Sequence, residues 1–178
     1  MKLKSKLGGM LLSFVLVFTI FQSTAAAYNK TGWRFAGTSF ISYKWGASLK
    51  DGVIKTGWTN ATSAWRTSTK DNVRFFYDSN SVNYLTRFTD ADSSYYGKML
   101  TTTNSNKMVT KFEGFENDNA VKVSSVAKST GVHELGHSLG LDHVSGTSIM
   151  NSSRDRTKIT TPQTDDLNGI KSIYGFKF

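Results

Sequence analysis

The sequence predicts an α+β domain, on three observations. Stretches with the alternation and the aromatic and β-branched residues typical of strands occupy much of the first two thirds of the chain. One amphipathic helix pattern lies among them, and helix signals resume only from Ser124 or Ser125 onward. Strands gathered early and helices gathered late, with one early helix, are typical of α+β architecture.

The N-terminal residues have the pattern of a secretory signal peptide. Three lysines lead, an apolar run spans residues 7–21, and three alanines (25–27) end the segment. An uncleaved membrane anchor is the alternative, but the run is shorter than the ~20 apolar residues that a spanning helix needs. We therefore expect residues 1–27 to be removed on export. Residues 28–178 would then form one secreted, extracellular domain without stable membrane insertion.

Composition excludes several classes of function. The chain has no cysteine, which rules out disulfides, thiol catalysis and cysteine metal ligands. Without the three signal lysines, 19 of the 22 basic residues remain against 13 acidic ones, a net charge of +6. That charge could favour acidic partners, or simply keep the protein soluble. No basic and aromatic stripe indicates nucleic acid, and we expect a monomer.

The first elements after residue 28 are a strand and a helix. FISYKW (40–45) alternates and is rich in aromatic and β-branched residues, which indicates a strand. After the Asp51–Gly52 turn, apolar residues recur at intervals of four, three and four, which makes one apolar helix face. That face consists of Ile54, Trp58, Ala61 and Trp65.

Three further strands are expected before the second helix. VRFFYDS (73–79) has the composition of a buried strand. MVTKFEGF (108–115) is another candidate, and we assign its Phe112 and Phe115 to the core. The polar stretch between these two contains YYGKML (95–100) as its one strand candidate.

All three histidines of the chain lie in HELGHSLGLDH, residues 133–143. His133 and His137 are four residues apart, so on a helix they share one face and can bind one Zn²⁺ at about 2.0–2.1 Å. Gly140 follows three residues later, where glycine readily ends a helix in a left-handed conformation. Continued helix would carry His143 about 15 Å along the axis from His133, so the helix must end for His143 to reach the same ion.

Glu134 indicates what such a site would do. Three histidines and no cysteine leave one zinc position open for water, as in catalytic sites. Neutral ligands leave the ion its full charge, which lowers the pKa of the bound water toward about 7. Glu134 can take the proton of that water as general base and pass it to the leaving amine, while the ion polarises the peptide carbonyl. These residues predict amide hydrolysis by a metal-activated water.

The extended pattern HExxHxxGxxH, followed by Ser148–Ile149–Met150, resembles the metzincin metallopeptidases. The resemblance implies a catalytic zinc held by the three histidines, and a methionine turn in which Met150 supports the site without binding the metal. It also implies a zincin-like fold. That fold has a twisted, mostly parallel sheet with an antiparallel edge strand, an active-site helix and a C-terminal helix.

The stretch TDDLNGIKSIYG (164–175) is similar to the last helix of the matrixin branch, which has paired Asp, then Asn-Gly-Ile and a Tyr-Gly end. We expect Thr161 to cap this helix, Pro162 to occupy its first turn and Gly175 to end it. The paired Asp165 and Asp166 suit the N-terminal end of the helix dipole. The residues expected to face the core are Leu167, Ile170, Ile173 and Tyr174.

The resemblance also places parts of a substrate cleft. YGKMLTTT (96–103) would be the edge strand that pairs with the backbone of a bound peptide. Arg154, Arg156 and Lys158 follow Met150, in the segment that walls the main specificity pocket of the family. There they would favour acidic side chains on the substrate, and solvent exposure is the alternative.

The chain departs from matrixins in its latency and metal features. It has no cysteine for a cysteine-switch propeptide, and no further histidines for a structural zinc. Val144 stands where matrixins tend to have serine, and Asn151 replaces a tyrosine often found after the methionine. Calcium stays open, because the candidate oxygen ligands are also ordinary solvated loop residues. They are Asp90, Asp92, Glu113, Glu116 and Asp118.

The sequence therefore predicts a secreted zinc endopeptidase that acts on protein or peptide substrates. The assigned residues are His133, His137 and His143 for the metal, Glu134 for catalysis, and Gly140 and Met150 for support. Two alternatives remain. One is a catalytically silent zinc-containing binding or adhesion module, and the other is a zinc hydrolase of cell-wall peptide cross-links.

Overall fold

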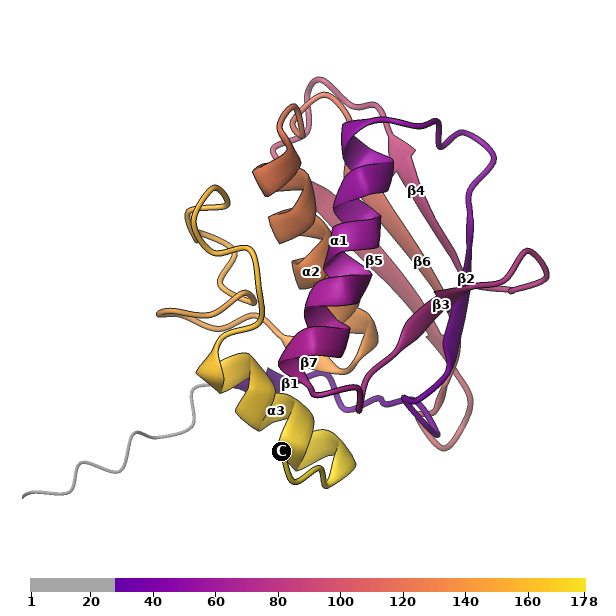
Figure 1. Ribbon diagram of the computed structural model, residues 1–178, viewed down its shortest axis with the longest axis vertical. Coiled ribbons are helices and arrows are strands. Elements are labelled where there is room, and N and C mark those ends of the chain that lie inside the picture. The colour runs from indigo at the N-terminus through magenta and orange to yellow at the C-terminus, as the bar shows by residue number, and fades with distance from the viewer. Residues whose placement is uncertain (1–27) are drawn as a thin grey trace, which may run out of the picture.

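One sheet forms the back of the molecule in the computed structural model, which describes residues 28–178 (Figure 1). The expected signal peptide, 1–27, lies outside the described residues. The strands of the sheet are β2 (Ile41–Trp45), β3 (Phe75–Tyr77), β4 (Tyr84–Phe88), β5 (Gly97–Thr103) and β6 (Val109–Asn117). Their order is β3-β2-β4-β6-β5, with parallel pairs throughout except for the antiparallel pair β5–β6 at one edge. The predicted parallel sheet with an antiparallel edge strand is confirmed.

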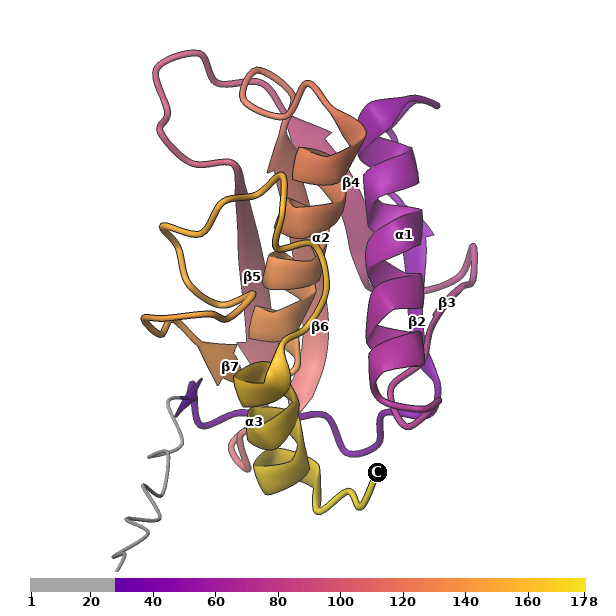
Figure 2. The same cartoon turned by 60° about the vertical axis from the view of Figure 1, so that its left-hand side comes forward.

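The helices in the described part of the chain are α1 (Val53–Ser68), α2 (Ser124–Ser138) and α3 (Thr164–Tyr174). Figures 1 and 2 show α1 and α2 side by side against one face of the sheet, with α3 near their ends. A short antiparallel pair, β1 (Asn29–Lys30) with β7 (Leu141–Asp142), contacts α3. None of the helices within 28–178 is long and apolar enough to span a bilayer.

Two tryptophans of α1 help to explain why α2, the helix that carries the histidines, packs closely against α1 and the sheet. Trp58 and Trp65 are fully buried, as their spacing predicts. The indole N–H of Trp58 donates to the Thr86 carbonyl of the sheet, and that of Trp65 donates to the Val132 carbonyl of α2. Gly57 lets α2 approach, because a Cβ on it would lie 2.4 Å from the Cβ of Ala127. Helix α2 is thereby fixed against α1 along its length.

Strand β4 is absent from the sequence prediction, which treated this part of the chain as a polar connection; that prediction was wrong. Leu85 is its one fully buried apolar residue, and it faces the helices beside Gly114. Polar Thr86 and Arg87 follow it, so the usual alternation is missing. The strand exists because it pairs on both sides, with β2 and with β6.

Two predicted core assignments also differ from the structure. β3 is an edge strand, so Phe76 and Tyr77 are 40% and 54% exposed and only Phe75 is buried. Phe112 is fully buried, as expected. Phe115 points to the opposite face of the sheet, because Phe112 and Phe115 are an odd number of residues apart on one strand. There it lies half-buried beside Tyr84, with ring centres 5.9 Å apart.

The last helix begins two residues later than its composition suggests. Gln163 is the N-cap rather than Thr161, and Pro162 precedes the cap. The reason is Asp166, whose carboxylate accepts the Gln163 backbone N–H at 2.7 Å in a capping box. Gly175 ends the helix in the left-handed region with φ 74°, as predicted. Of the predicted core residues, Ile170 is fully buried, Ile173 and Tyr174 pack against the core, and Leu167 is half-buried.

Candidate functional site

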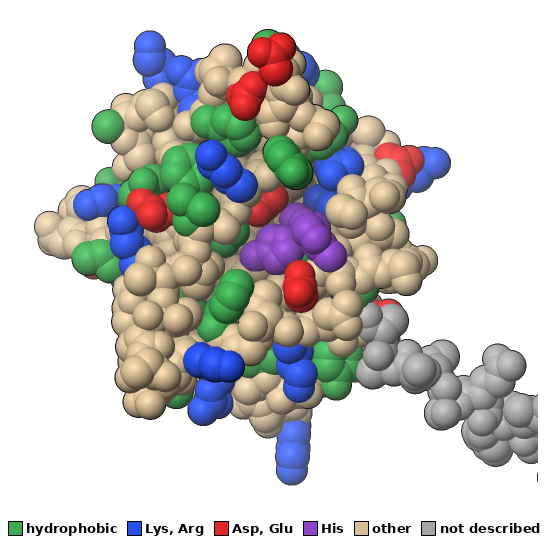
Figure 3. Space-filling model, turned by 180° about the vertical axis from the view of Figure 1, so that it is seen from behind, with side chains coloured by type: hydrophobic (Ala, Val, Ile, Leu, Met, Phe, Trp, Pro, Cys, Tyr) green, Lys and Arg blue, Asp and Glu red, His purple; other side chains and the backbone are tan. Residues whose placement is uncertain are grey.

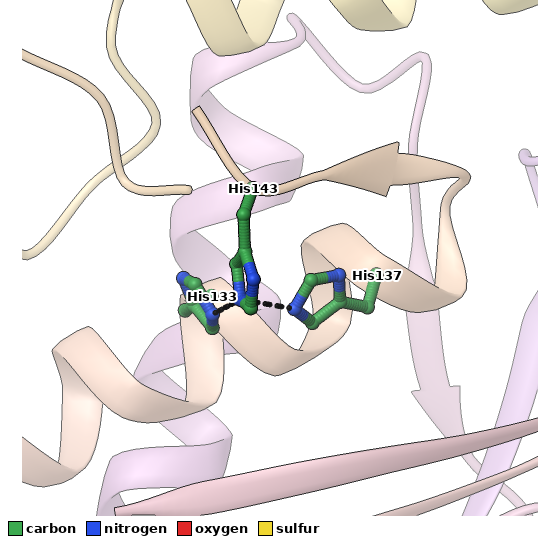
Figure 4. A group of neighbouring side chains, drawn as sticks. All are labelled: His133, His137 and His143. Carbon is green, nitrogen blue, oxygen red and sulfur yellow. Dashed lines mark hydrogen bonds between the residues drawn. The ribbon is translucent and has the colours of Figure 1, made fainter. Parts of the chain in front are cut away.

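The three histidines converge as their spacing predicts. His133 and His137 project from one face of α2, and His143 comes back from the segment after β7 to meet them (Figure 4). The Nε2 atom of His143 lies 3.1 Å from Nε2 of His133 and 3.1 Å from Nε2 of His137. Within 28–178 this is the one group of three metal-binding side chains, with ligand atoms within 4.8 Å of one another. Figure 3 shows the cluster at the surface, on the face turned away from the view in Figure 1.

Backbone carbonyls fix the orientation of the two helix histidines. Nδ1 of His133 lies 2.7 Å from the Ile149 oxygen, and Nδ1 of His137 lies 3.0 Å from the Leu141 oxygen. A carbonyl oxygen only accepts, so Nδ1 carries the hydrogen in both rings and the lone pair of Nε2 faces the centre of the cluster. Burial lowers the pKa of His133 and of His137, which keeps both rings neutral.

These observations fit a zinc ion. Tetrahedral zinc with Zn–N distances of 2.0–2.1 Å separates its nitrogen ligands by about 3.3–3.4 Å. The two spacings to His143 are 3.1 Å, close to that value, and all three donor atoms lie within 4.8 Å of one another. Imidazole nitrogen is a ligand type that suits zinc. The cluster can therefore hold zinc with a small adjustment of the rings.

Gly140 makes the return of His143 possible. Its φ is 94°, a left-handed conformation that L side chains rarely adopt, and a Cβ there would lie 2.4 Å from the Trp33 oxygen. The N-terminal segment clamps this turn, because Thr31 N–H donates to the Gly140 oxygen and the Trp33 indole donates to the His137 oxygen. The predicted helix end at Gly140 is confirmed, and the clamp by residues 29–33 is new.

Met150 lies behind the cluster, as the sequence predicts. It is 1% exposed, and Gly136 leaves room for it, since a Cβ on Gly136 would be 2.5 Å from the Met150 sulfur. Asp166 of α3 holds this loop in place. Its buried carboxylate accepts hydrogen bonds from Ser148 Oγ at 2.5 Å and from Ile149 N–H at 2.8 Å. The Ile149 peptide therefore links α3 to His133: its N–H donates to Asp166 and its oxygen accepts from His133.

Glu134 is buried beside the histidines, at the floor of a cavity of about 660 Å³ that the histidines also line. Burial raises the pKa of Glu134 to about 8, against the opposing charges of Arg154 and Arg156. Gly97 of β5 leaves room for the carboxylate, because a Cβ on Gly97 would lie 2.9 Å from its Oε1. Strand β5, the predicted edge strand, thus runs directly past Glu134 along one wall of the cavity.

The two arginines after Met150 are not simply solvated, so the exposure alternative fails for them. Arg154 is 5% exposed and donates through Nε and a terminal nitrogen to Ser129, and also to the Asn151 oxygen. Its terminal nitrogen also lies 3.1 Å from His133 Nδ1. That approach is a contact rather than a hydrogen bond, because Nδ1 already donates to Ile149. Arg156 is half-buried and lines the cavity, whereas Lys158 is exposed and pairs with Asp155.

Two of the carboxylates considered for calcium pair with basic side chains. Glu113 pairs with Lys111 at 2.9 Å, and Asp118 pairs with Arg87. Glu116 is fully buried and has no hydrogen-bond partner among residues 28–178. Within these residues the carboxylates do not form a group that could hold a metal ion, and calcium binding stays a prediction.

Sequence reasoning missed two contributors to this site, Trp33 and Thr130. Trp33 carries no motif, and only the folded chain brings it to the cavity. Thr130, which also lines the cavity, could have been found, because it lies four residues before Glu134 on the same helix face.

Comparisons with known proteins agree with this geometry. The family model of the matrixins, described as Peptidase_M10, matches residues 58–175. The fold matches many solved chains, among them high choriolytic enzyme 1, a hatching enzyme zinc-protease from the medaka fish Oryzias latipes. That chain is 15% identical with a TM-score of 0.52, and the match covers 82% of this chain and 94% of the other. A search of curated proteins found no match. Because the family model covers the second helix, the histidines and α3, the chain belongs to the matrixin family and is a zinc metalloendopeptidase.

Proposed function

We propose that this protein is a secreted endopeptidase in which His133, His137 and His143 hold the zinc and Glu134 is the general base. The observation that carries the proposal is the position of Glu134. Its carboxylate is buried in the cavity that the histidines line, next to a free strand edge. Secretion rests on the signal-peptide pattern of residues 1–27.

Zinc, when bound, supplies the Lewis-acid polarisation of a peptide carbonyl and of water. The chain itself supplies the proton transfers. Glu134 accepts a proton from the attacking water at one carboxylate oxygen and delivers it to the leaving amine nitrogen. Burial raises the pKa of Glu134, and the positive charge of a bound zinc would lower it toward the carboxylate form that accepts the proton. The buried walls around Glu134 limit exchange of that proton with bulk water.

Substrate backbone would pair with β5. Among residues 28–178 this strand pairs only with β6, so its other edge offers unpaired N–H and C=O groups to an extended peptide. Main-chain pairing of this kind tolerates many sequences, which suits an endopeptidase of general protein substrates.

The test is hydrolysis of casein and of short peptides by the zinc-loaded protein and by Glu134→Gln. We expect the variant to keep its zinc, because the three ligands are intact, and to lose roughly 10²–10⁴-fold in kcat/KM. Glu113→Gln is the matched control, since it neutralises a carboxylate on the opposite face of the sheet. It should leave kcat/KM within about twofold.

Two outcomes would overturn parts of the proposal. A Glu134→Gln variant that binds zinc and cleaves at the rate of the parent removes Glu134 as general base. A zinc-loaded parent that cleaves neither casein nor any peptide of a mixed library favours a silent binding module instead. N-terminal sequencing of exported protein, expected to begin at Tyr28, tests the secretion separately.

A further inference from the structure

The cavity beside Glu134 contains a cationic wall that the hydrolytic mechanism does not use. Arg156 lines this cavity, and its guanidinium lies 4.1 Å from the centre of the Tyr96 ring. The backbone of Tyr96 is held in place, because its carbonyl oxygen accepts the Asn117 backbone N–H at 2.8 Å. Stacking on the ring favours one plane for the guanidinium and so orients its N–H groups.

Arg156 has donor capacity left over. One terminal nitrogen donates to the Ser152 oxygen at 2.9 Å, and the other terminal nitrogen makes no hydrogen bond among residues 28–178. Among residues 28–178, no carboxylate lies within ion-pair distance of either Arg156 or Arg154. The free terminal N–H groups can therefore donate to a ligand that enters the cavity.

The charge of this wall is positive. Arg154 is buried behind it, and its own donors are taken by Ser129 and Asn151 rather than by an acid. Both arginines are close enough to Glu134 for their charges to act on it. Two guanidinium groups therefore face one carboxylate, and an anionic substrate group would be attracted while a cationic one would be repelled.

We propose that Arg156 forms an anion-binding subsite that receives an acidic side chain of the substrate. The inference rests on the proposed endopeptidase function and names its substrate class. Glu134 delivers its proton to the leaving amine, so the residue that supplies this amine lies on the Glu134 side of the cleaved bond. The acidic side chain is therefore the one directly after the cleaved bond.

The experiment compares fluorogenic peptides that differ only in that residue, which is Glu, Gln, Leu or Lys. Glu and Gln have the same shape, so their ratio of kcat/KM isolates the charge. For the zinc-loaded protein we expect a Glu-to-Gln ratio of roughly tenfold or more, and the Lys peptide to be cut most slowly.

Arg156→Met should bring the Glu-to-Gln ratio close to one while the Leu peptide is still cleaved, which shows that the variant is folded. Lys158→Met is the matched control, because it removes an equal charge from an exposed residue two positions away. It should keep the parent ratio within about twofold, since exposed charges are screened by salt. A ratio near one in the parent, or a preference that survives in Arg156→Met, would overturn the subsite.

A binding measurement separates this inference from the hydrolytic function. Metal-free parent protein cannot use zinc chemistry, so equilibrium binding of the Glu and Gln peptides is measured by fluorescence anisotropy. We expect the Glu peptide to bind roughly tenfold more tightly, and Arg156→Met to abolish the difference. If zinc-loaded protein cleaves nothing, hydrolysis fails as a function, and equal binding of the two peptides would then refute the subsite as well.

Discussion

Gly140 meets two demands at one backbone position. Its φ of 94° ends α2, and its bare Cα lets the Trp33 carbonyl approach. Gly146 in the following loop also has a positive φ, 81°, but a Cβ there would meet nothing within 4 Å. Alanine variants at the two positions therefore separate the free-energy cost of the backbone conformation from that of steric crowding.

We expect Gly140→Ala to lower the free energy of unfolding by about 3 kcal/mol or more, and Gly146→Ala by about 1 kcal/mol. The first variant should also lose zinc affinity, because the turn that delivers His143 is displaced. Urea unfolding and zinc titration check both effects. Equal losses in the two variants would mean that the approach of Trp33 is unimportant.

Glu116 is a buried acid that has no hydrogen-bond partner among residues 28–178. It is fully buried, and burial followed by the nearby charge of Glu134 raises its pKa well above the ordinary value. The unfolded chain releases this proton near pH 4.3, while the folded protein retains it to higher pH. Folded protein then binds more protons, so Glu116 makes the free energy of unfolding fall as pH rises above about 4.

Glu116→Gln removes this dependence. We expect it to raise the melting temperature by about 2–8 °C at pH 8 and to match the parent at pH 4. Calorimetry at the two pH values, with metal-free protein, is the measurement. A variant that is less stable than the parent at pH 8 would show that the Glu116 carboxylate has a partner that stabilises its charge.

Some residues of the site could be placed from the sequence, and others could not. Spacing alone was enough to place His133 and His137 on one face, because helix geometry is local. The burial of Arg154 could not be predicted in that way. Its donors find acceptors on Ser129 and Asn151, and Ser129 comes from a helix 25 residues earlier in the chain. Such a pairing depends on how the loop after Met150 folds back over α2.

At the scale of elements, α3 and the loop before Met150 act as one unit through Asp166. The carboxylate accepts from Ser148, Ile149 and Gln163, which joins the loop to the start of the helix. An asparagine in its place offers one acceptor oxygen and brings an NH₂ group that faces other donors.

Asp166→Asn should therefore lower the free energy of unfolding by about 1.5–3 kcal/mol and weaken zinc binding, because Ile149 orients His133. Asp155→Asn, an exposed carboxylate in the same loop region, is the control and should cost less than about 1 kcal/mol. Chemical unfolding and competition with a zinc indicator provide the two values. If zinc affinity is unchanged in Asp166→Asn, α3 does not act on the ligands.

Elements were predicted where their own apolar residues recur at a regular spacing, as in α1. They were missed where pairing with neighbouring strands determines the structure. β4 has one fully buried apolar residue, Leu85, and is a strand because both of its neighbours are strands. β3 has the apolar composition of a central strand, yet it lies at an edge with Phe76 and Tyr77 exposed. Position within a sheet is a property of the whole fold, which explains both errors.

For the whole molecule, the zinc should stabilise the folded state without being needed for folding. The core around Trp58 and Trp65 joins α1, α2 and the sheet without the histidines. A ligand at 100–1,000 times its Kd adds about 2.7–4.1 kcal/mol to the free energy of unfolding.

Chelation with EDTA should therefore lower the melting temperature by roughly 5–15 °C, reversibly on adding zinc, while the far-UV circular dichroism spectrum stays the same. His143→Ala should show a much smaller zinc-dependent shift, because it leaves two ligands on α2. A metal-free protein without helical signal at 20 °C would contradict the independent core.

The bond between Asp166 and the loop before Met150 has a consequence for how the protein is made. A chain is synthesised from its N-terminus, so the three histidines exist before the helix that holds the loop behind them. Until α3 (Thr164–Tyr174) has been added and has docked, Ile149 lacks its carboxylate acceptor and His133 lacks a fixed carbonyl. A nascent chain therefore carries the metal ligands without a finished cleft. We therefore expect full zinc affinity and peptide cleavage only after the last helix is complete.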